Sequence, residues 1–170
     1  TVAIGNGALQ TQNFTTATNS YNTAVGYDAG TSVTTGMQNT LIGGLAGDAI
    51  TTADENTVIG YQAGTALTVG NNNVALGSLA LGTDTKGDRN VAVGRAALFS
   101  QNFTTTTDSY NVGVGYSAGA AITTGVRNTL IGGLSGDAIT TGIRNTIVGG
   151  AAGDALTDAD YNVAVGMGAL

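Results

Sequence analysis

The sequence predicts an all-β fold: a parallel β-solenoid, or β-roll, of about ten short coils. Three observations predict it. A glycine recurs at intervals of 17 or 21 residues, a short run rich in β-branched residues precedes each of these glycines, and no window shows the 3.6-residue period of an amphipathic helix. A fixed repeat of this length is typical of solenoids, in which each repeat stacks on its neighbours.

The repeat is clearest at residues 128–144, which read NTLIGGLSGDAITTGIR, and its positions are numbered from the asparagine. Two of the steps between successive position-five glycines are 21 residues long and the others are 17, so four short steps and one long step span 89 residues. Residues 10–22 resemble residues 99–111 at that distance. We therefore expect one repeat domain over 1–170, made of two five-coil units at about 1–89 and 90–170. Because residue 1 already lies inside a repeat, we expect an excerpt of a longer fibrous protein.

Each copy contains two candidate strands and two candidate corners. Positions two to four predict a short strand because β-branched residues dominate there. Glycine at position five predicts a corner with a positive φ or with no room for a Cβ. Positions eleven to thirteen predict a second short strand, and Gly or Ala at position fifteen predicts the second corner. The expected corner glycines are Gly26, Gly43, Gly60, Gly77, Gly94, Gly115, Gly132 and Gly149.

Position one is asparagine in nine copies, and Thr1 is the exception. If copies stack at the inter-strand spacing of about 4.8 Å, ten coils rise roughly 48 Å and the asparagines form one column. Each side-chain amide then bonds the amides above and below, which stabilises in-register strands. We expect this structural role rather than ligand binding. The ladder comprises Asn22, Asn39, Asn56, Asn73, Asn90, Asn111, Asn128, Asn145 and Asn162.

Position three is never polar, and positions two and four lie on the opposite face of the strand from it. A strand that is apolar on both faces is buried on both faces. One face fills the coil interior, and a 17-residue coil offers no second layer for the other. We therefore expect a homo-oligomer, with a homotrimer favoured, in which identical chains cover position three. The expected oligomer face is Ala24, Leu41, Val58, Leu130 and Ile147.

Residues 22–30 (NTAVGYDAG) and 56–64 (NTVIGYQAG) resemble the Asn-Thr-Ala-Val-Gly-Tyr repeats of phage and other viral tail-fibre proteins. The same core is similar to the head repeats of trimeric autotransporter adhesins of the YadA type, which form trimers of left-handed parallel β-rolls. The resemblance covers nearly the whole chain. The 17-residue period is longer than that of the adhesin repeats, and the sequence contains no coiled-coil stalk, membrane anchor or chaperone domain.

The composition argues against several classes of protein. Only 9% of residues are charged, the net charge is −6, and five cationic residues are scattered along the chain, so nucleic acid and anionic membranes are not expected partners. No apolar run approaches the length of a membrane span. There is no Cys or His, and the only close carboxylate pairs are Asp54–Glu55 and Asp158/Asp160. A glycosidase with paired carboxylates remains an alternative, but we expect no enzyme and no cofactor.

The long repeats hold all three phenylalanines, Phe14, Phe99 and Phe103, and also Tyr21 and Tyr110 just before the next strand. Extra residues bulge outward, and exposed aromatics mark contacts, so these loops are candidate contacts for a host receptor or a glycan. The alternative is that the aromatics pack over the coil. At position seventeen, Arg127 and Arg144 lie on adjacent coils, where like charges repel. Asp137, Asp154 or an acidic group on another protomer is expected to neutralise them.

Calcium binding and ice binding are two less favoured interpretations of the sequence. Asp48, Asp137 and Asp154 lie in segments similar to the Gly-Gly-x-Gly-x-Asp calcium repeats, although one carboxylate per coil is few ligands for Ca²⁺. The threonine column at position thirteen suggests ice binding, but Val69, Lys86 and Asp158 interrupt the column beside it, and a ladder of hydroxyls between coils is the alternative.

The expected function is mechanical: a structural shaft segment of a virion tail fibre or extracellular adhesin, which spaces and presents host-contacting parts. The alternative is an extracellular filament whose subunits stack end to end, because solenoids need caps and residues 1–9 and 162–170 read as bare strand and corner pieces.

Overall fold

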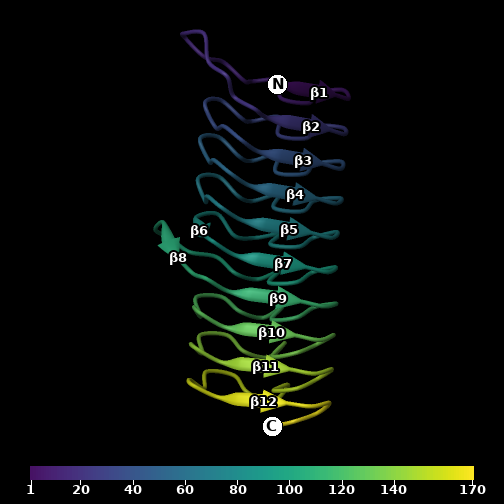
Figure 1. The fold of residues 1–170 in the computed structure, drawn as a ribbon, viewed down its shortest axis with the longest axis vertical. Coiled ribbons are helices and arrows are strands. Elements are labelled where there is room, and N and C mark those ends of the chain that lie inside the picture. The colour runs from purple at the N-terminus through teal and green to yellow at the C-terminus, as the bar shows by residue number, and fades with distance from the viewer.

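The computed structural model describes residues 1–170 and confirms the predicted fold class: a parallel β-solenoid with a period of 17 residues (Figure 1). Ten three-residue strands form one sheet, and each strand begins a new coil, so the coils are numbered 1 to 10 in the same order. The strands of this long sheet are β1 (Val2–Ile4), β2 (Thr23–Val25), β3 (Thr40–Ile42), β4 (Thr57–Ile59), β5 (Val74–Leu76), β7 (Val91–Val93), β9 (Val112–Val114), β10 (Thr129–Ile131), β11 (Thr146–Val148) and β12 (Val163–Val165).

Equal repeat positions pair along the whole sheet. Leu41 of β3 lies opposite Val58 of β4, and the register is kept across a 21-residue coil, where Ala92 pairs with Gly113. The four extra residues of such a coil are therefore accommodated outside the long sheet. The two termini lie at opposite ends of the stack (Figure 1).

The predicted corner at position five is confirmed. The glycines there have φ between 123° and 139°, which side-chain-bearing residues rarely adopt. The corner is also crowded, because a Cβ on Gly43 would lie 2.6 Å from the carbonyl oxygen of Gly60 in the next coil. Both reasons for a glycine therefore hold at this position.

The predicted second strand is wrong. Positions eleven to thirteen form turns, as where the N–H of Val33 donates to the carbonyl of Gly30 at 3.0 Å. Besides the corner glycine, each coil has left-handed residues at other positions, such as position seven, where Asp28 has a φ of 51°, and position seventeen, where Gln38 has a φ of 59°. A different second sheet exists: β6 (Gly87–Asp88) and β8 (Thr107–Asp108) pair where the 21-residue coil 6 bulges outward (Figure 1).

The structure corrects the assignment of the two strand faces. The five residues predicted as an oligomer face are fully buried within the single chain, as part of its continuous core; they are Ala24, Leu41, Val58, Leu130 and Ile147. Position three therefore points into the coil, and positions two and four point outward. The prediction failed because Val and Ile at positions two and four were read as core residues, although the interior is filled by positions three, eight, nine and twelve.

Position nine decides how the interior is filled. Where it is glycine, position twelve is aliphatic, as in coil 3 with Gly47 and Ile50. A Cβ on Gly47 would lie 2.7 Å from Ile50 and 2.9 Å from Leu41, so the glycine makes room for both. Where position nine is leucine, position three is alanine and position twelve is polar. Coils 1, 5 and 6 follow this second pattern, with Leu9 and Gln12, Leu81 and Asp84, and Leu98 and Gln101.

Candidate functional site

The chain has no pocket and no group of three or more His, Cys, Asp or Glu side chains placed to share a metal ion. No helix is present that could cross a membrane. The polar chemistry of the molecule instead lies in columns that run from coil to coil and in side chains exposed along the edges of the sheet.

The asparagine column exists as predicted, but its bonds differ from a simple amide ladder. The Oδ1 of Asn39 accepts the backbone N–H of Asn56 at 3.0 Å, and the Nδ2 of Asn39 donates to the carbonyl of Ala53 at 2.8 Å. The side-chain oxygen thus accepts a hydrogen bond from the next coil, and the side-chain nitrogen donates one within the asparagine's own coil. Direct amide contacts, such as Asn56 Nδ2 to Asn39 Oδ1 at 3.1 Å, occur in addition. Asn22 to Asn145 in this column are buried, which supports a structural role.

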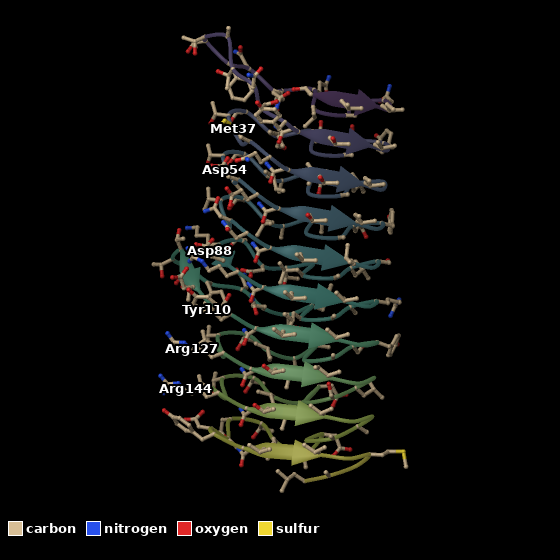
Figure 2. The ribbon with its side chains drawn as sticks, in the orientation of Figure 1. Met37, Asp54, Asp88, Tyr110, Arg127 and Arg144 are labelled. Carbon is tan, nitrogen blue, oxygen red and sulfur yellow. The ribbon has the colours of Figure 1, made fainter.

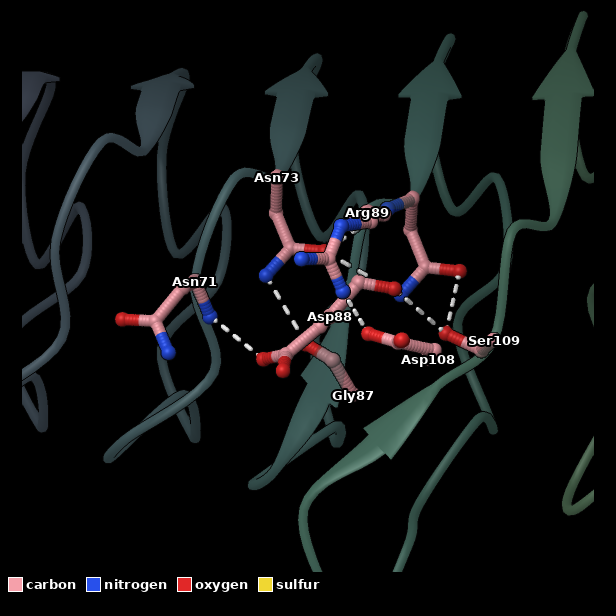
Figure 3. Close-up of polar contacts among 8 residues, drawn as sticks. Asn71, Asn73, Gly87, Asp88, Arg89, Asp108 and Ser109 are labelled. Carbon is pink, nitrogen blue, oxygen red and sulfur yellow. Dashed lines mark hydrogen bonds and ion pairs between the residues drawn. The ribbon is translucent and has the colours of Figure 1, made fainter.

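A second polar column at position sixteen is absent from the sequence-based prediction. The backbone N–H of Met37 donates to Asp54 at 2.7 Å, that of Asp54 to Asn71 at 2.8 Å, and that of Asn71 to Asp88 at 2.7 Å (Figures 2 and 3). These side chains each bond the coil before them, whereas the position-one asparagines bond the coil after them. Since position sixteen also holds Met, Val and Ile, no single residue type marks the column in the sequence.

The two acidic pairs considered as catalytic groups are partly used in this column. Asp54 and Asp160 accept the backbone N–H groups of Met37 and Ile143 at 2.7 and 2.8 Å. Glu55 is exposed, and Asp158 accepts the hydroxyl of its neighbour Thr157. The structure therefore gives two of these four carboxylates a backbone-bonding role.

A buried polar chain joins coils 5, 6 and 7. Gln101 Nε2 donates to Asp84 Oδ2 at 2.5 Å, and Gln101 Oε1 accepts Asn111 Nδ2 at 2.8 Å. Asp84 Oδ1 accepts the backbone N–H of Gly87 at 3.0 Å. Burial raises the pKa of the Asp84 carboxyl, and the hydrogen bonds from Gln101 and the backbone oppose that rise. The chain of bonds fixes the point where the 21-residue turn leaves the coil.

The base of the long turn is also tied to the long sheet. Ser109 Oγ donates to Asn90 Oδ1 at 2.8 Å and to the Asp88 carbonyl at 2.9 Å, and Arg89 forms an ion pair with Asp108 (Figure 3). Both partners of the ion pair are about half exposed, so its contribution to stability is small, roughly 0–1 kcal/mol.

The phenylalanines do not stand out from the surface as a contact loop would require. Phe103 is only 6% exposed, and Phe14 and Phe99 are half-buried. Phe99 covers Gly82, where a Cβ would lie 2.9 Å from the ring. The packing alternative therefore describes Phe99 and Phe103 better than the contact alternative.

The exposed aromatics are the six tyrosines. Two of them, Tyr21 and Tyr110, belong to the predicted contact loops, and the other four were not predicted as contact residues. All six occupy position six or the last position of a coil, on either side of the long sheet, and are 45–68% exposed: Tyr21, Tyr27, Tyr61, Tyr110, Tyr116 and Tyr161. At Tyr27 a hydrogen bond to Asp28, and then the charge of that carboxylate, raise the pKa of the phenol. The tyrosines could have been predicted from the sequence, because they recur at two repeat positions that flank a strand whose positions two and four face outward.

Aromatic rings lie beside two of the three arginines at the coil edge, and one of these two, Arg89, also pairs with Asp108. Arg144 donates to the Tyr161 hydroxyl and lies 5.2 Å from the centre of that ring, and Arg89 lies 5.7 Å from the Tyr110 ring (Figure 2). Neither Arg127 nor Arg144 forms an ion pair within the chain, so Asp137 and Asp154 do not neutralise them. Neutralisation by an acidic group of another chain stays a prediction.

Among the residues behind the calcium and ice interpretations, Asp48 and the position-thirteen threonines form side-chain hydrogen bonds between coils. Asp48 accepts the hydroxyl of Thr65 at 2.6 Å. Position-thirteen hydroxyls donate to the carbonyl of the same position in the next coil, as from Thr34 to Thr51 at 3.1 Å and from Thr68 to Thr85 at 2.9 Å. These hydroxyls form the ladder that was the alternative to ice binding.

Comparison of the chain with known protein families, curated proteins and solved structures finds no match.

Proposed function

We propose that the chain is a shaft segment, a stiff spacer in a virion tail fibre or an extracellular adhesin that presents host-contacting parts at a fixed distance. The observation that carries this proposal is the single ten-stranded sheet, paired in register from β1 to β12, with the termini at opposite ends of the stack (Figure 1). In a solenoid built this way, each added coil increases the length of the rod and leaves its cross-section unchanged.

Two features support stiffness. The position-one asparagines bond the following coil through buried hydrogen bonds, and the position-sixteen side chains bond the preceding coil through partly buried ones. Sliding of one coil over the next would break both sets. The interior forms one continuous apolar cluster through the coils rather than separate cores with hinges between them. A spacer needs both the bonds between coils and the continuous core, because a flexible connection between coils would make the distance between its two ends variable.

The outward face of the long sheet supports lateral association of identical chains, including a homotrimer, as part of the same proposal. It carries Thr or Val at position two and Val, Ile or Leu at position four, and Ile59 and Ile131 are 36% and 40% exposed. Exposed apolar residues in a continuous row are typical of contact surfaces. The tyrosines on both sides of this face supply amphipathic rings for a receptor or a glycan.

The test of the spacer role uses the chain with a compact marker domain fused to each end, which also prevents the ends from stacking. Electron microscopy should show the markers separated by a narrow distribution of distances. Duplicating residues 56–72 should lengthen the separation by about 5 Å, one inter-strand step. Markers that lie together, or a separation that varies widely from particle to particle, would contradict the proposal.

Lateral association is tested separately by sedimentation of the unfused chain. We expect an oligomer that dissociates when Ile59 and Ile131 are both changed to Asp, whereas Thr52→Asp, on the opposite side of the coil, leaves it intact. A parent chain that sediments as a monomer would refute lateral association and leave the single-chain spacer standing.

A further inference from the structure

We infer that the position-seventeen side chains of coils 5 to 9 form a binding site for an acidic polysaccharide that lies along the rod. Guanidinium groups bind its carboxylates, and tyrosine rings pack against its sugars. The inference rests on the glycan contact in the proposed function, to which it gives a site and a ligand class, and it does not involve the spacer role. This arginine–tyrosine column comprises Arg89, Tyr110, Arg127, Arg144 and Tyr161.

The column gathers most of the positive charge of an acidic chain. The chain has five cationic residues and a net charge of −6, and three of the five cations are the arginines of this column. In coils 2 to 4 the same position holds Gln38, Glu55 and Asn72, none of which is cationic. Stacking therefore brings together cations that are far apart in the sequence, and an anion is attracted to coils 5 to 9 more than to coils 2 to 4.

The backbone presents the five side chains in the same way. All five residues are exposed and left-handed, with φ between 50° and 60°. The backbone N–H of Arg127 donates to the Ser109 carbonyl of the preceding coil at 2.7 Å, and that of Arg144 donates to the Val126 carbonyl at 3.0 Å. Figure 2 shows both arginine side chains pointing away from the stack. Neighbouring members of the column are therefore about 5 Å apart along the rod.

The two adjacent arginines have no carboxylate beside them at position sixteen. That position is Val126 in coil 7 and Ile143 in coil 8, whereas coil 9 has Asp160 there. Arg127 forms no ion pair, and its side chain makes no hydrogen bond within the chain. Because like charges on neighbouring strands repel, an anion that contacts both Arg127 and Arg144 relieves this repulsion.

The tyrosines orient the other two arginines and keep ring surface free. Arg89 lies 5.7 Å from the centre of the Tyr110 ring and pairs with Asp108, and Arg144 lies 5.2 Å from the Tyr161 ring and donates to its hydroxyl. Guanidinium groups that are already oriented lose less conformational entropy on binding. Tyr110 and Tyr161 are 45% and 64% exposed, so part of each ring is free to pack against the apolar face of a sugar.

The spacing of the cations favours an acidic polysaccharide over a nucleic acid. The arginines lie in coils 5, 7 and 8, so the steps between them are about 10 and 5 Å. One ring of an extended β-linked polysaccharide spans about the height of one coil, so carboxylates on alternate or successive sugars meet the guanidinium groups and form bidentate pairs. Double-stranded DNA carries one charge per about 1.7 Å, and a chain of net charge −6 repels so dense a polyanion.

The test measures the binding of a β-linked mannuronate hexasaccharide, which carries a carboxylate on every sugar, to the unfused chain by isothermal titration calorimetry. We expect binding at low ionic strength that is largely lost in about 0.5 M salt, because salt screens contacts between exposed charges. The β-linked mannose hexasaccharide has the same length and no carboxylates, and it should bind at least about tenfold more weakly.

Arg127→Gln should weaken binding of the mannuronate hexasaccharide about tenfold, because it removes the charge-assisted hydrogen bonds of one guanidinium group. The fold should be kept, since Arg127 has no side-chain bond within the chain and coil 2 carries Gln38 at the same position. Arg95→Gln is the matched control. It removes the same charge from an exposed residue at position six, on the other side of the long sheet, and should leave binding unchanged.

The inference is overturned if the mannuronate hexasaccharide does not bind, or if Arg127→Gln binds it as strongly as Arg95→Gln. It is also overturned if a thymidine oligonucleotide of equal charge binds more tightly than the hexasaccharide and loses affinity with Arg127→Gln, because the column would then be a nucleic-acid site. Equal binding of the acidic and neutral hexasaccharides would overturn the charged site and leave the glycan contact of the proposed function standing. The spacer role is judged separately, by the separation of the marker domains.

Discussion

The side-chain oxygen of Asn73 accepts the backbone N–H of Asn90 at 2.9 Å, while its nitrogen donates to the carbonyl of Gly87 at 2.9 Å. Asn73 is fully buried, so neither of these backbone groups has water as a substitute. The same pair of bonds recurs from coil to coil and explains why only asparagine, with an acceptor and a donor on a short side chain, recurs at position one.

Replacing Asn73 with Leu should therefore lower the free energy of unfolding by about 2–5 kcal/mol, because it leaves two buried backbone groups unpaired. Urea denaturation followed by circular dichroism measures the change. Asn13→Leu is the control, since Asn13 is exposed and its side chain makes no hydrogen bond. Equal effects of the two substitutions would refute the role of the column.

The buried Asp84 predicts a pH dependence with a definite sign. Burial raises its pKa in the folded chain above the value in the unfolded chain, so the folded chain binds more protons between those two values. The contribution of Asp84 to stability is therefore greatest at low pH and is lost as the pH rises through its folded-state pKa.

Asp84→Asn removes this titration, so the free energy of unfolding of the variant minus that of the parent should increase from pH 3 to pH 7. Urea titrations at several pH values measure this difference, in which the other carboxylates cancel. A difference for Asp84→Asn that decreases with pH would contradict the sign derived from burial.

Gly113 and Leu98 should be energetically coupled. Gly113 is the one glycine at position three, and a Cβ on it would lie 2.9 Å from Leu98 Cγ. Gly113→Ala alone should destabilise the chain by about 1–3 kcal/mol through overpacking. In a chain that already carries Leu98→Ala, the same substitution should cost much less, and a double-mutant cycle from urea denaturation measures the coupling. Additive effects would show that the two positions do not compete for space.

The left-handed bend at position seventeen offers a stabilising substitution. Gln38 has a φ of 59°, and its side chain is exposed and makes no hydrogen bond. Gln38→Gly should raise the melting temperature, because the αL region costs an L-residue about 1–2 kcal/mol, more than the roughly 0.5–1 kcal/mol of extra chain entropy that glycine loses. Thr35→Gly, exposed on the same coil without a positive φ, should lower it. A destabilising Gln38→Gly would contradict this view of the bend.

The period, the register, the corner at position five and the asparagine column could be predicted because each shows as one residue type recurring at one position. Which face of each strand points into the coil could not be predicted. Leu41 and Val58 are as apolar as Ile42 and Ile59, yet position three turns inward both where position nine is glycine and where it is leucine, as at Ala75. Polarity alone carries no information about that choice.

The remaining errors have a similar cause. Asp54 and Asn71 bond backbone groups one coil away, a relationship that depends on stacking geometry and not on a motif. Phe103 is buried although it lies in an insertion, because the turn that contains it returns to the stack through β8. Tyr61 is exposed because position six follows the corner and points away from the coil.

The most direct test of coil stacking uses the absence of cysteine in this chain. Cysteines introduced at Thr52 and Thr141, exposed and at the same position of coils 3 and 8, accept one spin label each. Pulsed electron resonance should give a narrow distance near five inter-strand steps, about 24 Å, that increases by about 5 Å when residues 56–72 are duplicated. A broad distribution, or a distance unchanged by the added coil, would contradict the stacked rod.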